Sequence, residues 1–271
     1  MTASLRGKTA VTGIGAYGMG LAPDHTPLEL MGKAAISAVE DAGLKMSDID
    51  GVCAATFYHF FPSLSAAEYL GIHPTWSNSD MVGGSSFMNY ILQAAAAIET
   101  GQCNHVLILY GSNARSSRDL NGLIETPFYE NLYEPMVPLS GYALAASRYL
   151  HEGLAKREHF AHVHYSARQW AMKNPDAILR DPITIDEILA ARPIATPLTK
   201  YDCCLLSDGG AALVLSRADL AKDTRQDPIY FLGGGSAHYH REIAQMPSLT
   251  TTAAVESSAR AYEMARVTPK D

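Results

Sequence analysis

One almost purely aliphatic run constrains the fold of this chain more than any other feature. The segment Val106–Tyr110 reads VLILY and shows no alternating polar face. A strand of this kind is typical of a sheet that is buried on both faces, so helices must cover each side. Short strand patterns alternate with helix patterns along the first hundred residues, and strand patterns return at 211–215 and 229–232. This order predicts an α/β fold built in layers.

The stretch between residues 113 and 196 differs from its surroundings. Helix patterns follow one another there, at 141–152, 156–172 and 184–191, and no strand pattern interrupts them. We interpret this stretch as a helical insertion between two strands of the sheet. The predicted domains are an N-terminal domain of residues 1–112 and 197–227, a helical loop domain of residues 113–196, and the beginning of a C-terminal domain at residues 228–271.

Two distant segments of the chain echo each other. Residues 38–48 and 261–271 share Ala, Glu, Ala and Asp at a constant offset, and a glycine-rich strand pattern precedes each copy. Four identities over eleven positions, within the same order of strand and helix, predict two related halves. On this interpretation the second half is expected to be incomplete, because the chain ends soon after that half begins.

Composition narrows the classes of partner. The chain carries 21 Lys and Arg against 28 Asp and Glu, a formal net charge of −7, which disfavours nucleic acid or an anionic membrane as the main partner. No apolar run approaches the roughly 20 residues that span a bilayer. Four cysteines in 271 residues do not make a disulfide framework, so we expect a reducing, cytoplasmic compartment. The adjacent Cys203 and Cys204 are expected to be buried, and no Cys/His spacing predicts a metal site.

A glycine motif near the N-terminus has the spacing of a dinucleotide-binding fingerprint; it reads GIGAYG and covers residues 13–18. That fingerprint needs a helix that begins at its last glycine, but here the helix pattern begins only near Thr26. We therefore interpret the motif as a tight glycine turn rather than a nucleotide site.

The helix pattern that begins near Gly84 is the most informative candidate for a functional site. Apolar side chains surround it, which predicts a buried helix. Its first turn reads Gly83-Gly84-Ser85-Ser86, and a buried helix N-terminus with free N–H groups suits a thiolate, an oxyanion or a phosphate. Gly84, Ser85 and Ser86 are therefore candidate contacts for an oxyanion or a thioester. The alternative is that a serine side chain simply caps the helix.

A second candidate is the glycine-rich loop that leads into His238, Tyr239 and His240. Glycines let the backbone approach a ligand, and a histidine could serve as an acid or a base. These three residues are candidate substrate contacts, although a solvated loop with surface histidines fits the pattern equally well. Cys103 lies beyond the C-terminal end of the Gly84 helix, where the helix dipole disfavours a thiolate, so we expect a structural role for it.

The segment from Pro197 to Ala212, PLTKYDCCLLSDGGAA, closely resembles the part of sterol-carrier-protein-type thiolases that returns the chain to the core sheet. Two further stretches, NPDA at 174–177 and ITIDEIL at 183–189, resemble the end of the helical loop domain in the same family. The resemblance extends over nearly the whole chain. It implies a thiolase-like fold with α-β-α-β-α layers, represented here by the N-terminal half with its helical loop insertion and by the start of the second half.

Within that resemblance, Gly84 occupies the position at which thiolases carry their reactive cysteine. Glycine cannot form an acyl-enzyme, so thiolysis or Claisen condensation through a covalent intermediate is not expected at this site. The missing cysteine, together with segments 83–87 and 238–250, resembles one subgroup in particular. Its members are lipid-transfer-protein-like aldolases that cleave β-hydroxyacyl-CoA side chains, as in bacterial steroid degradation.

Membership of that subgroup would imply several further properties. The activity would be retro-aldol cleavage in lipid metabolism, with a CoA thioester as substrate and no covalently bound cofactor. The enzyme would be a homodimer bound to an OB-fold and zinc-ribbon partner, and its catalytic tyrosines would lie beyond Asp271. Two alternatives stay open: an acyltransferase of the acetyl-CoA acetyltransferase (thiolase) type, and a non-catalytic scaffold that binds CoA esters or transfers lipids.

Overall fold

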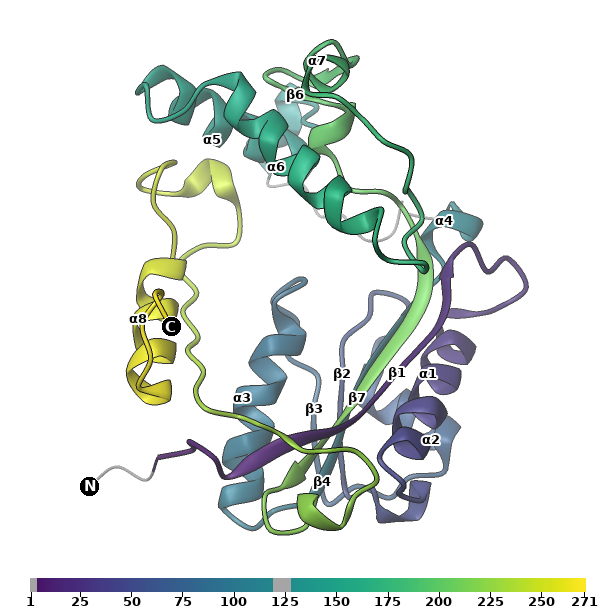
Figure 1. The fold of residues 1–271 in the computed structure, drawn as a ribbon. Coiled ribbons are helices and arrows are strands. Elements are labelled where there is room, and N and C mark those ends of the chain that lie inside the picture. Colours follow the sequence, from purple (N-terminus) through teal and green to yellow (C-terminus); the bar gives the residue numbers. More distant parts are fainter. Residues whose placement is uncertain (1–3, 119–127) are drawn as a thin grey trace. The chain divides into compact units, whose positions relative to one another are not determined.

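The computed structural model describes residues 4–118 and 128–271 (Figure 1). The chain separates into two compact units, and each is described by itself. The sheet unit comprises Met1–Asp119, Ser207–Ala237 and Ala254–Asp271, and the helical unit comprises Leu120–Leu206 and His238–Ala253. The domain boundaries given above stay a prediction, because compactness alone does not define a domain.

The sheet unit is built on a six-stranded sheet with the order β3-β2-β4-β7-β1-β8. β2 is parallel to both β3 and β4, whereas β7 runs antiparallel to β4 and β1, and β8 runs antiparallel to β1. The strands are β1 (Thr9–Gly20), β2 (Gly51–Ala54), β3 (Trp76–Asn78), β4 (His105–Ser112), β7 (Asp208–Arg217) and β8 (Ile229–Tyr230). This mixed sheet, flanked by helices, confirms the predicted α/β class.

Helices cover both faces of the sheet (Figure 1). α1 (Pro27–Asp41) and α2 (Pro62–Leu70) pack on one face, and α3 (Ser86–Glu99) packs on the other. The same unit contains α4 (Ala114–Ser117), which follows β4, and α8 (Ala254–Ala265). The helix starts expected near Thr26 and Gly84 agree with α1 and α3 to within about two residues, which is the usual uncertainty of helix ends.

The strand β4 shows the consequence of this two-sided cover. Leu107 and Leu109 are buried in the core that includes α1 and α2, while Val106 and Ile108 are buried in the core that includes α3. Each face of the strand therefore needs its own aliphatic side chains. The burial on both faces that was predicted for this run is confirmed.

The glycines of β1 let α1 lie directly on the sheet. Residues 13–18, predicted above to form a tight turn, lie inside β1, so that interpretation is wrong. A Cβ atom on Gly13 would lie 2.3 Å from the carbonyl oxygen of Ala38, and one on Gly15 would lie 2.2 Å from that of Ala34. No side chain fits at such distances, so the close approach of the helix requires glycine at both positions. Tight turns and close helix packing both require glycine, so the spacing of the glycines in the sequence did not show which of the two was present.

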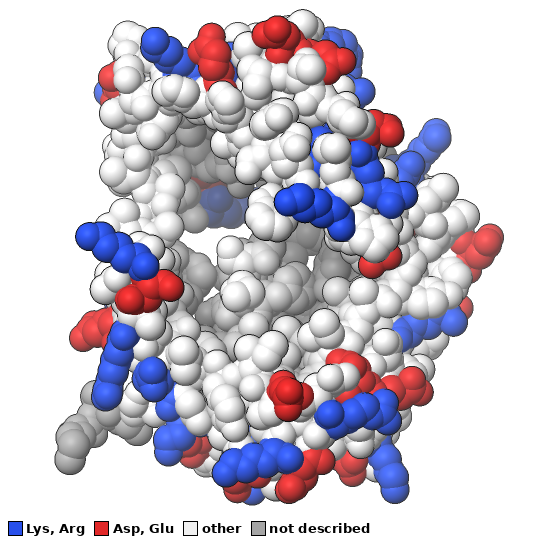
Figure 2. All heavy atoms as spheres, in the orientation of Figure 1, with Lys and Arg blue, Asp and Glu red and all other residues white. Residues whose placement is uncertain are grey.

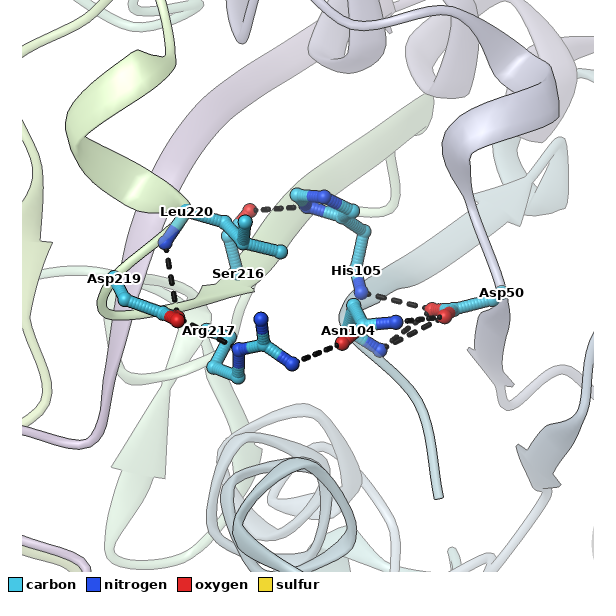
Figure 3. A network of polar contacts seen from close by, with 7 residues as sticks. All are labelled: Asp50, Asn104, His105, Ser216, Arg217, Asp219 and Leu220. Carbon is cyan, nitrogen blue, oxygen red and sulfur yellow. Dashed lines mark hydrogen bonds and ion pairs between the residues drawn. The ribbon is translucent and has the colours of Figure 1, made fainter. Parts of the chain in front are cut away.

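A polar network ties the amino end of β4 to its neighbours (Figure 3). The carboxylate of Asp50, just before β2, accepts hydrogen bonds from the backbone N–H groups of Asn104 and His105, both at 2.8 Å. The side-chain oxygen of Asn104 accepts a hydrogen bond from Arg217, at the end of β7, at 2.7 Å. His105 Nδ1 lies 2.9 Å from the Ser216 hydroxyl, and burial lowers the pKa of His105. The network therefore holds β2, β4 and β7 together at the amino ends of the parallel strands.

The helical unit contains α5 (Leu139–His151), α6 (Arg157–Ala171) and α7 (Ile185–Leu189). The predicted absence of strands between residues 113 and 196 is wrong, because β5 (Pro193–Ala195) pairs with β6 (Leu198–Thr199). These strands have three and two residues, too few for an alternating pattern to show in the sequence. Residues 119–127 of the predicted loop domain lie outside the described residues.

The two echoing segments form the same type of helix end. α1 is followed by Gly43 with φ 72°, and α8 is followed by Arg266 with φ 56°, both in the left-handed region. In the first copy the N–H of Leu44 bonds to the carbonyl of Val39 at 3.0 Å, and the equivalent bond after α8 measures 3.3 Å. This bond across the last turn is the mark of a Schellman cap.

The close approach of a glycine pair to a helix is also repeated. A Cβ atom on Gly233 would lie 2.7 Å from the carbonyl oxygen of Ala261, and one on Gly235 would lie 2.0 Å from that of Ser257. The segment before α8 thus meets its helix through two glycines spaced two apart, as β1 meets α1. The echo in the sequence therefore corresponds to a repeated contact between a pair of glycines and a helix, although only the first pair lies in a strand.

The repeated helix end leads to a test of stability. We expect Arg266→Gly to raise the free energy of unfolding by about 1 kcal/mol, because a side chain in the left-handed region costs about that much and glycine avoids the cost. Gly43→Ala should lower the same free energy, since its Cβ atom would also lie 3.1 Å from the Cβ of Arg225. Urea unfolding followed by circular dichroism measures both, with Arg266→Lys as the matched control. A Gly variant no more stable than the Lys control would contradict the equivalence of the two helix ends.

Candidate functional site

The candidate oxyanion site lies at the carboxyl ends of the parallel strands in the sheet unit. β3 ends at Asn78, and a loop leads from there to Ser86, where α3 begins. The ring of Phe87 lies 5.2 Å from the ring of Tyr110, so the first turn of α3 is beside the last residues of β4. α/β sheets bind ligands at this edge, because loops and helix N-termini gather there.

Gly84 lies in this loop with open space where a side chain would be. A Cβ atom on Gly83 or Gly84 would meet none of the described residues within 4 Å. Gly83 has φ 74°, in the left-handed region, whereas Gly84 does not have a positive φ. Packing and backbone geometry therefore permit a side chain at position 84. Gly84 matters for the chemistry because, without a side chain, it offers no nucleophile.

The two serines of the first turn have different roles. Ser86 is fully buried, and its hydroxyl donates to the carbonyl of Gly83 at 2.7 Å and accepts from the N–H of Val82 at 2.9 Å. This side chain closes the loop in front of the helix. Ser85 is exposed at the N-cap position, and its side chain makes no capping hydrogen bond. Of the two hydroxyls, that of Ser85 remains the candidate for contact with a ligand.

Sequence reasoning missed Tyr90 as a polar contributor to this site. Tyr90 is fully buried one turn into α3, and its hydroxyl lies 2.6 Å from the carbonyl oxygen of Asp80 and 3.2 Å from that of Ala54. Burial, and to a lesser degree Cys53 and Asp80, raise the pKa of Tyr90, so the phenol stays protonated and donates. The signal in the sequence was a tyrosine in an otherwise apolar helix, since a buried hydroxyl needs a partner.

Asp208 is a second residue whose role the sequence did not reveal. It is almost fully buried at the start of β7, and its carboxylate accepts from the N–H groups of Ala22 at 2.8 Å, Arg115 at 2.9 Å and Ser116 at 3.0 Å. Burial alone raises the pKa of Asp208, but these hydrogen bonds outweigh it and lower the pKa overall. The ionised carboxylate therefore joins the loop that follows β1 to the helix α4 that follows β4.

His238, Tyr239 and His240 lie in the helical unit, whereas Gly84, Ser85 and Ser86 lie in the sheet unit. His238 and Tyr239 are exposed, and His240 is half-buried. The next two residues, Arg241 and Glu242, form an ion pair at 3.1 Å and line a cavity of about 490 Å³ together with residues of α5. The three candidate substrate contacts therefore precede this wall in the chain but do not themselves line the cavity.

A larger cavity, of about 770 Å³, lies in the helical unit between α5, α6 and the segment 198–204. Polar groups on its wall include His164, Asp202 and Cys203. Its apolar lining residues include Leu139, Ala146, Phe160, Val163, Ala167 and Leu198. A cavity of this size, with mostly apolar walls and a few polar groups, is typical of a site for a small organic ligand.

The four cysteines are free thiols in three kinds of environment. Cys103 is buried, as expected for a structural residue, and burial raises its pKa to about 12. Cys203 is half-buried and burial raises its pKa, but Cys204 is exposed, so the expectation that both are buried is wrong for Cys204. Both line the larger cavity. Among residues 4–118 and 128–271, no group of three or more His, Cys, Asp or Glu side chains is placed to hold a metal ion.

Charged side chains of both signs are spread over the surface. Figure 2 shows Lys and Arg interspersed with Asp and Glu on the face that it draws. Such mixing is unlike the clustered basic surface of a nucleic-acid-binding protein. Within the described part of the chain, no helix combines the length and the apolar character needed to cross a bilayer.

The contrast between the two serines can be tested by stability. We expect Ser86→Ala to lower the free energy of unfolding by about 1 kcal/mol, because the part-buried N–H of Val82 loses its partner, while the Gly83 carbonyl keeps the backbone N–H of Ser86. The adjacent Ser85→Ala, which removes an exposed hydroxyl, is the matched control and should change it by less than about 0.5 kcal/mol. Chemical denaturation measures both values. Equal effects of the two substitutions would show that the Ser86 hydroxyl does not hold the loop.

Comparison with known proteins places this geometry in a family. Residues 235–271 match the family model described as thiolase C-terminal domain-like. The solved structure of an "Ltp2-ChsH2(DUF35) aldolase" superposes with a TM-score of 0.85 at 28% sequence identity, covering 98% of this chain and 72% of that one. The thiolase-like character of the fold is thereby confirmed.

Two curated relatives are similar along most of this chain. The 17-hydroxy-3-oxo-4-pregnene-20-carboxyl-CoA lyase of Mycobacterium tuberculosis is 31% identical over 83% of this chain and 61% of its own length. The steroid side-chain-cleaving aldolase of Thermomonospora curvata is 30% identical over 90% of this chain and 68% of its own length. The chain thus spans about two thirds of the length of these relatives. At that identity and coverage, the chain belongs to the thiolase superfamily, in the sterol-carrier-protein-type branch that includes steroid side-chain-cleaving aldolases.

Proposed function

We propose that this chain forms part of an enzyme that cleaves a carbon–carbon bond of a β-hydroxyacyl-CoA by a retro-aldol reaction. The observation that carries the proposal is Gly84, which offers no nucleophile at the N-terminus of a helix whose backbone is otherwise ready to bind an oxyanion. The likeness to a carboxyl-CoA lyase and to a side-chain-cleaving aldolase supports the same class of reaction.

The chemistry of a retro-aldol cleavage suits a site without a thiol. The β-hydroxyl loses its proton, the Cα–Cβ bond breaks, and its electron pair moves into the thioester to form an enolate. A ketone or an aldehyde leaves, and a proton added at Cα then gives the shorter acyl-CoA. None of these steps forms a bond to the protein. The protein must instead stabilise the negative charge that develops on the thioester oxygen.

The first turn of α3 is the proposed source of that stabilisation. The N–H groups at a helix N-terminus carry partial positive charge, and in a fixed position they favour a developing oxyanion over the neutral carbonyl. The backbone N–H groups of Gly84 and Ser85 are the proposed donors. The missing side chain at position 84 leaves room for a thioester carbonyl there.

The larger cavity of the helical unit is a candidate site for an apolar group. Its mostly apolar walls suit an acyl group or the pantetheine arm of CoA better than they suit phosphate groups. His238, Tyr239 and His240 are proposed as further substrate contacts. The proposed substrate is a CoA thioester with a steroid side chain, and the reaction needs no covalently bound cofactor.

Turnover tests the proposal directly. The protein, together with the proposed OB-fold and zinc-ribbon partner, is incubated with a β-hydroxyacyl-CoA, and the ketone and the shortened acyl-CoA are measured by mass spectrometry. We expect the two products in equal amounts. No cleavage under these conditions, together with tight binding of the CoA ester, would favour the scaffold alternative and contradict the proposal.

Covalent labelling separates the aldolase from an acyltransferase. With radiolabelled acyl-CoA we expect no acid-stable label at residue 84 of the parent protein. Gly84→Cys should acquire one, because the introduced thiol can attack the thioester and release CoA. Both proteins also carry Cys204→Ser, so that the exposed thiol of Cys204 cannot contribute background label. A stable acyl group on the parent that turns over with CoA would identify an acyltransferase instead.

We also propose a homodimer, an OB-fold and zinc-ribbon partner, a cytoplasmic location and the three-domain division given above. The name Ltp2-ChsH2(DUF35) of the solved homologue supports a partner protein, and the match over 235–271 supports a C-terminal domain that begins near residue 228. Four free thiols support a reducing compartment. β3 is an edge strand of the sheet, and edge strands pair readily with a second copy.

The edge of β3 gives a test of the dimer. The exposed rings of Phe60 and Phe61 lie near it, because the backbone N–H of Ser63 bonds to the Ser79 hydroxyl just after β3. We expect Phe61→Glu to weaken a dimer by at least about tenfold through the burial of a charge in the interface. Sedimentation equilibrium measures the dissociation constant of the dimer. Ile36→Glu on α1, also at an exposed apolar residue, is the control, and equal effects of the two would place the interface elsewhere.

A further inference from the structure

The loop that carries Gly84 is not held by packing. Gly83 and Gly84 lack side chains, and Cβ atoms added to them would meet none of the described residues within 4 Å. Two successive glycines also give a backbone its greatest conformational freedom. An oxyanion site, however, stabilises a transition state only if its N–H groups already point to one place. Some other contact must therefore fix the loop.

Two side chains of α3 hold the start of this loop from within the helix. Tyr90 donates its buried hydroxyl to the carbonyl oxygen of Asp80 at 2.6 Å, with the carbonyl oxygen of Ala54 at 3.2 Å. Gln93, about one turn further along, donates to the carboxylate of Asp80 at 2.8 Å. Asp80 is thus held at its main chain and at its side chain. Its backbone N–H is also fixed, by the side-chain oxygen of Asn78 at 2.9 Å.

The other end of the loop is closed by Ser86, whose hydroxyl bonds to Val82 and Gly83. Asp80 and Ser86 therefore form two fixed points, with the glycines between them. Tyr90 has an additional effect, because its contact with Ala54 connects the loop to the last residue of β2. The glycine N–H groups are consequently held in place relative to the sheet as well as relative to the helix.

We propose that Tyr90 and Gln93 are positioning residues that hold the N–H groups at Gly84 in the geometry of an oxyanion site. The proposal rests on the proposed function and names what pre-organises that site. Neither side chain needs to touch the substrate. Their task is to replace the constraint that side-chain packing would otherwise place on the loop.

The test uses a thiol introduced at position 84 as a reporter that needs no substrate. In Gly84→Cys, aligned N–H groups should lower the thiol pKa below its ordinary value. The dependence of the iodoacetamide reaction rate on pH, read by peptide mass spectrometry at residue 84, gives that pKa. Adding Tyr90→Phe should raise the pKa of the introduced thiol and slow its reaction with iodoacetamide at pH 7 by about threefold or more. Adding Tyr69→Phe, at a half-exposed tyrosine on α2, is the control and should leave it unchanged.

A second variant separates positioning from general loss of stability. Gln93 is only partly buried, so Gly84→Cys with Gln93→Met removes the bond to Asp80 without emptying the core. We expect a thiol pKa raised in the same direction. A lowered thiol pKa that neither Tyr90→Phe nor Gln93→Met changes would overturn the positioning role and leave the retro-aldol proposal standing. A thiol pKa that is not lowered even with Tyr90 in place would overturn the oxyanion geometry itself.

Discussion

The steric fit between α1 and the sheet is the constraint on which the rest of the structure depends. Added Cβ atoms at four sheet glycines would lie only 2.1–2.3 Å from carbonyl oxygens of α1, so the helix sits as close as two backbones allow. Because β1, β4 and β7 all take part, one helix fixes three strands, and with them the edge at which α3 begins. The four glycines are Gly13, Gly15, Gly111 and Gly210.

Features governed by nearby residues were predictable from the sequence. The helix expected to begin near Thr26 does so, with Thr26 in a capping box with Glu29, and the aliphatic run of β4 is buried on both faces. The glycines at 13–18 and the short strands β5 and β6 were not predictable. In the first case the deciding neighbour is a helix about twenty residues away in the chain, and in the second the elements are too short to carry a pattern.

In the candidate site, too, features set by neighbouring residues were predictable and contacts between distant residues were not. A helix beginning after Gly83-Gly84 could be read from the sequence, and so could the missing nucleophile. The anchoring bonds could not, because Tyr90 reaches Ala54 and Asp208 reaches Ala22 across large separations in the chain. A buried polar group reveals that it needs a partner but not which one. The functional pattern was therefore visible before the contacts that hold it in place.

The repeated contact between a pair of glycines and a helix shows what two segments can share after their sequences diverge. Residues 38–48 and 261–271 agree at only four of eleven positions, yet both helices meet a pair of glycines and end in the left-handed region. At that helix end one copy has Gly43 and the other has Arg266, so even the residue best suited to the angle has been exchanged. If the halves descend from a duplicated ancestor, the backbone path has been inherited more faithfully than the residues that follow it.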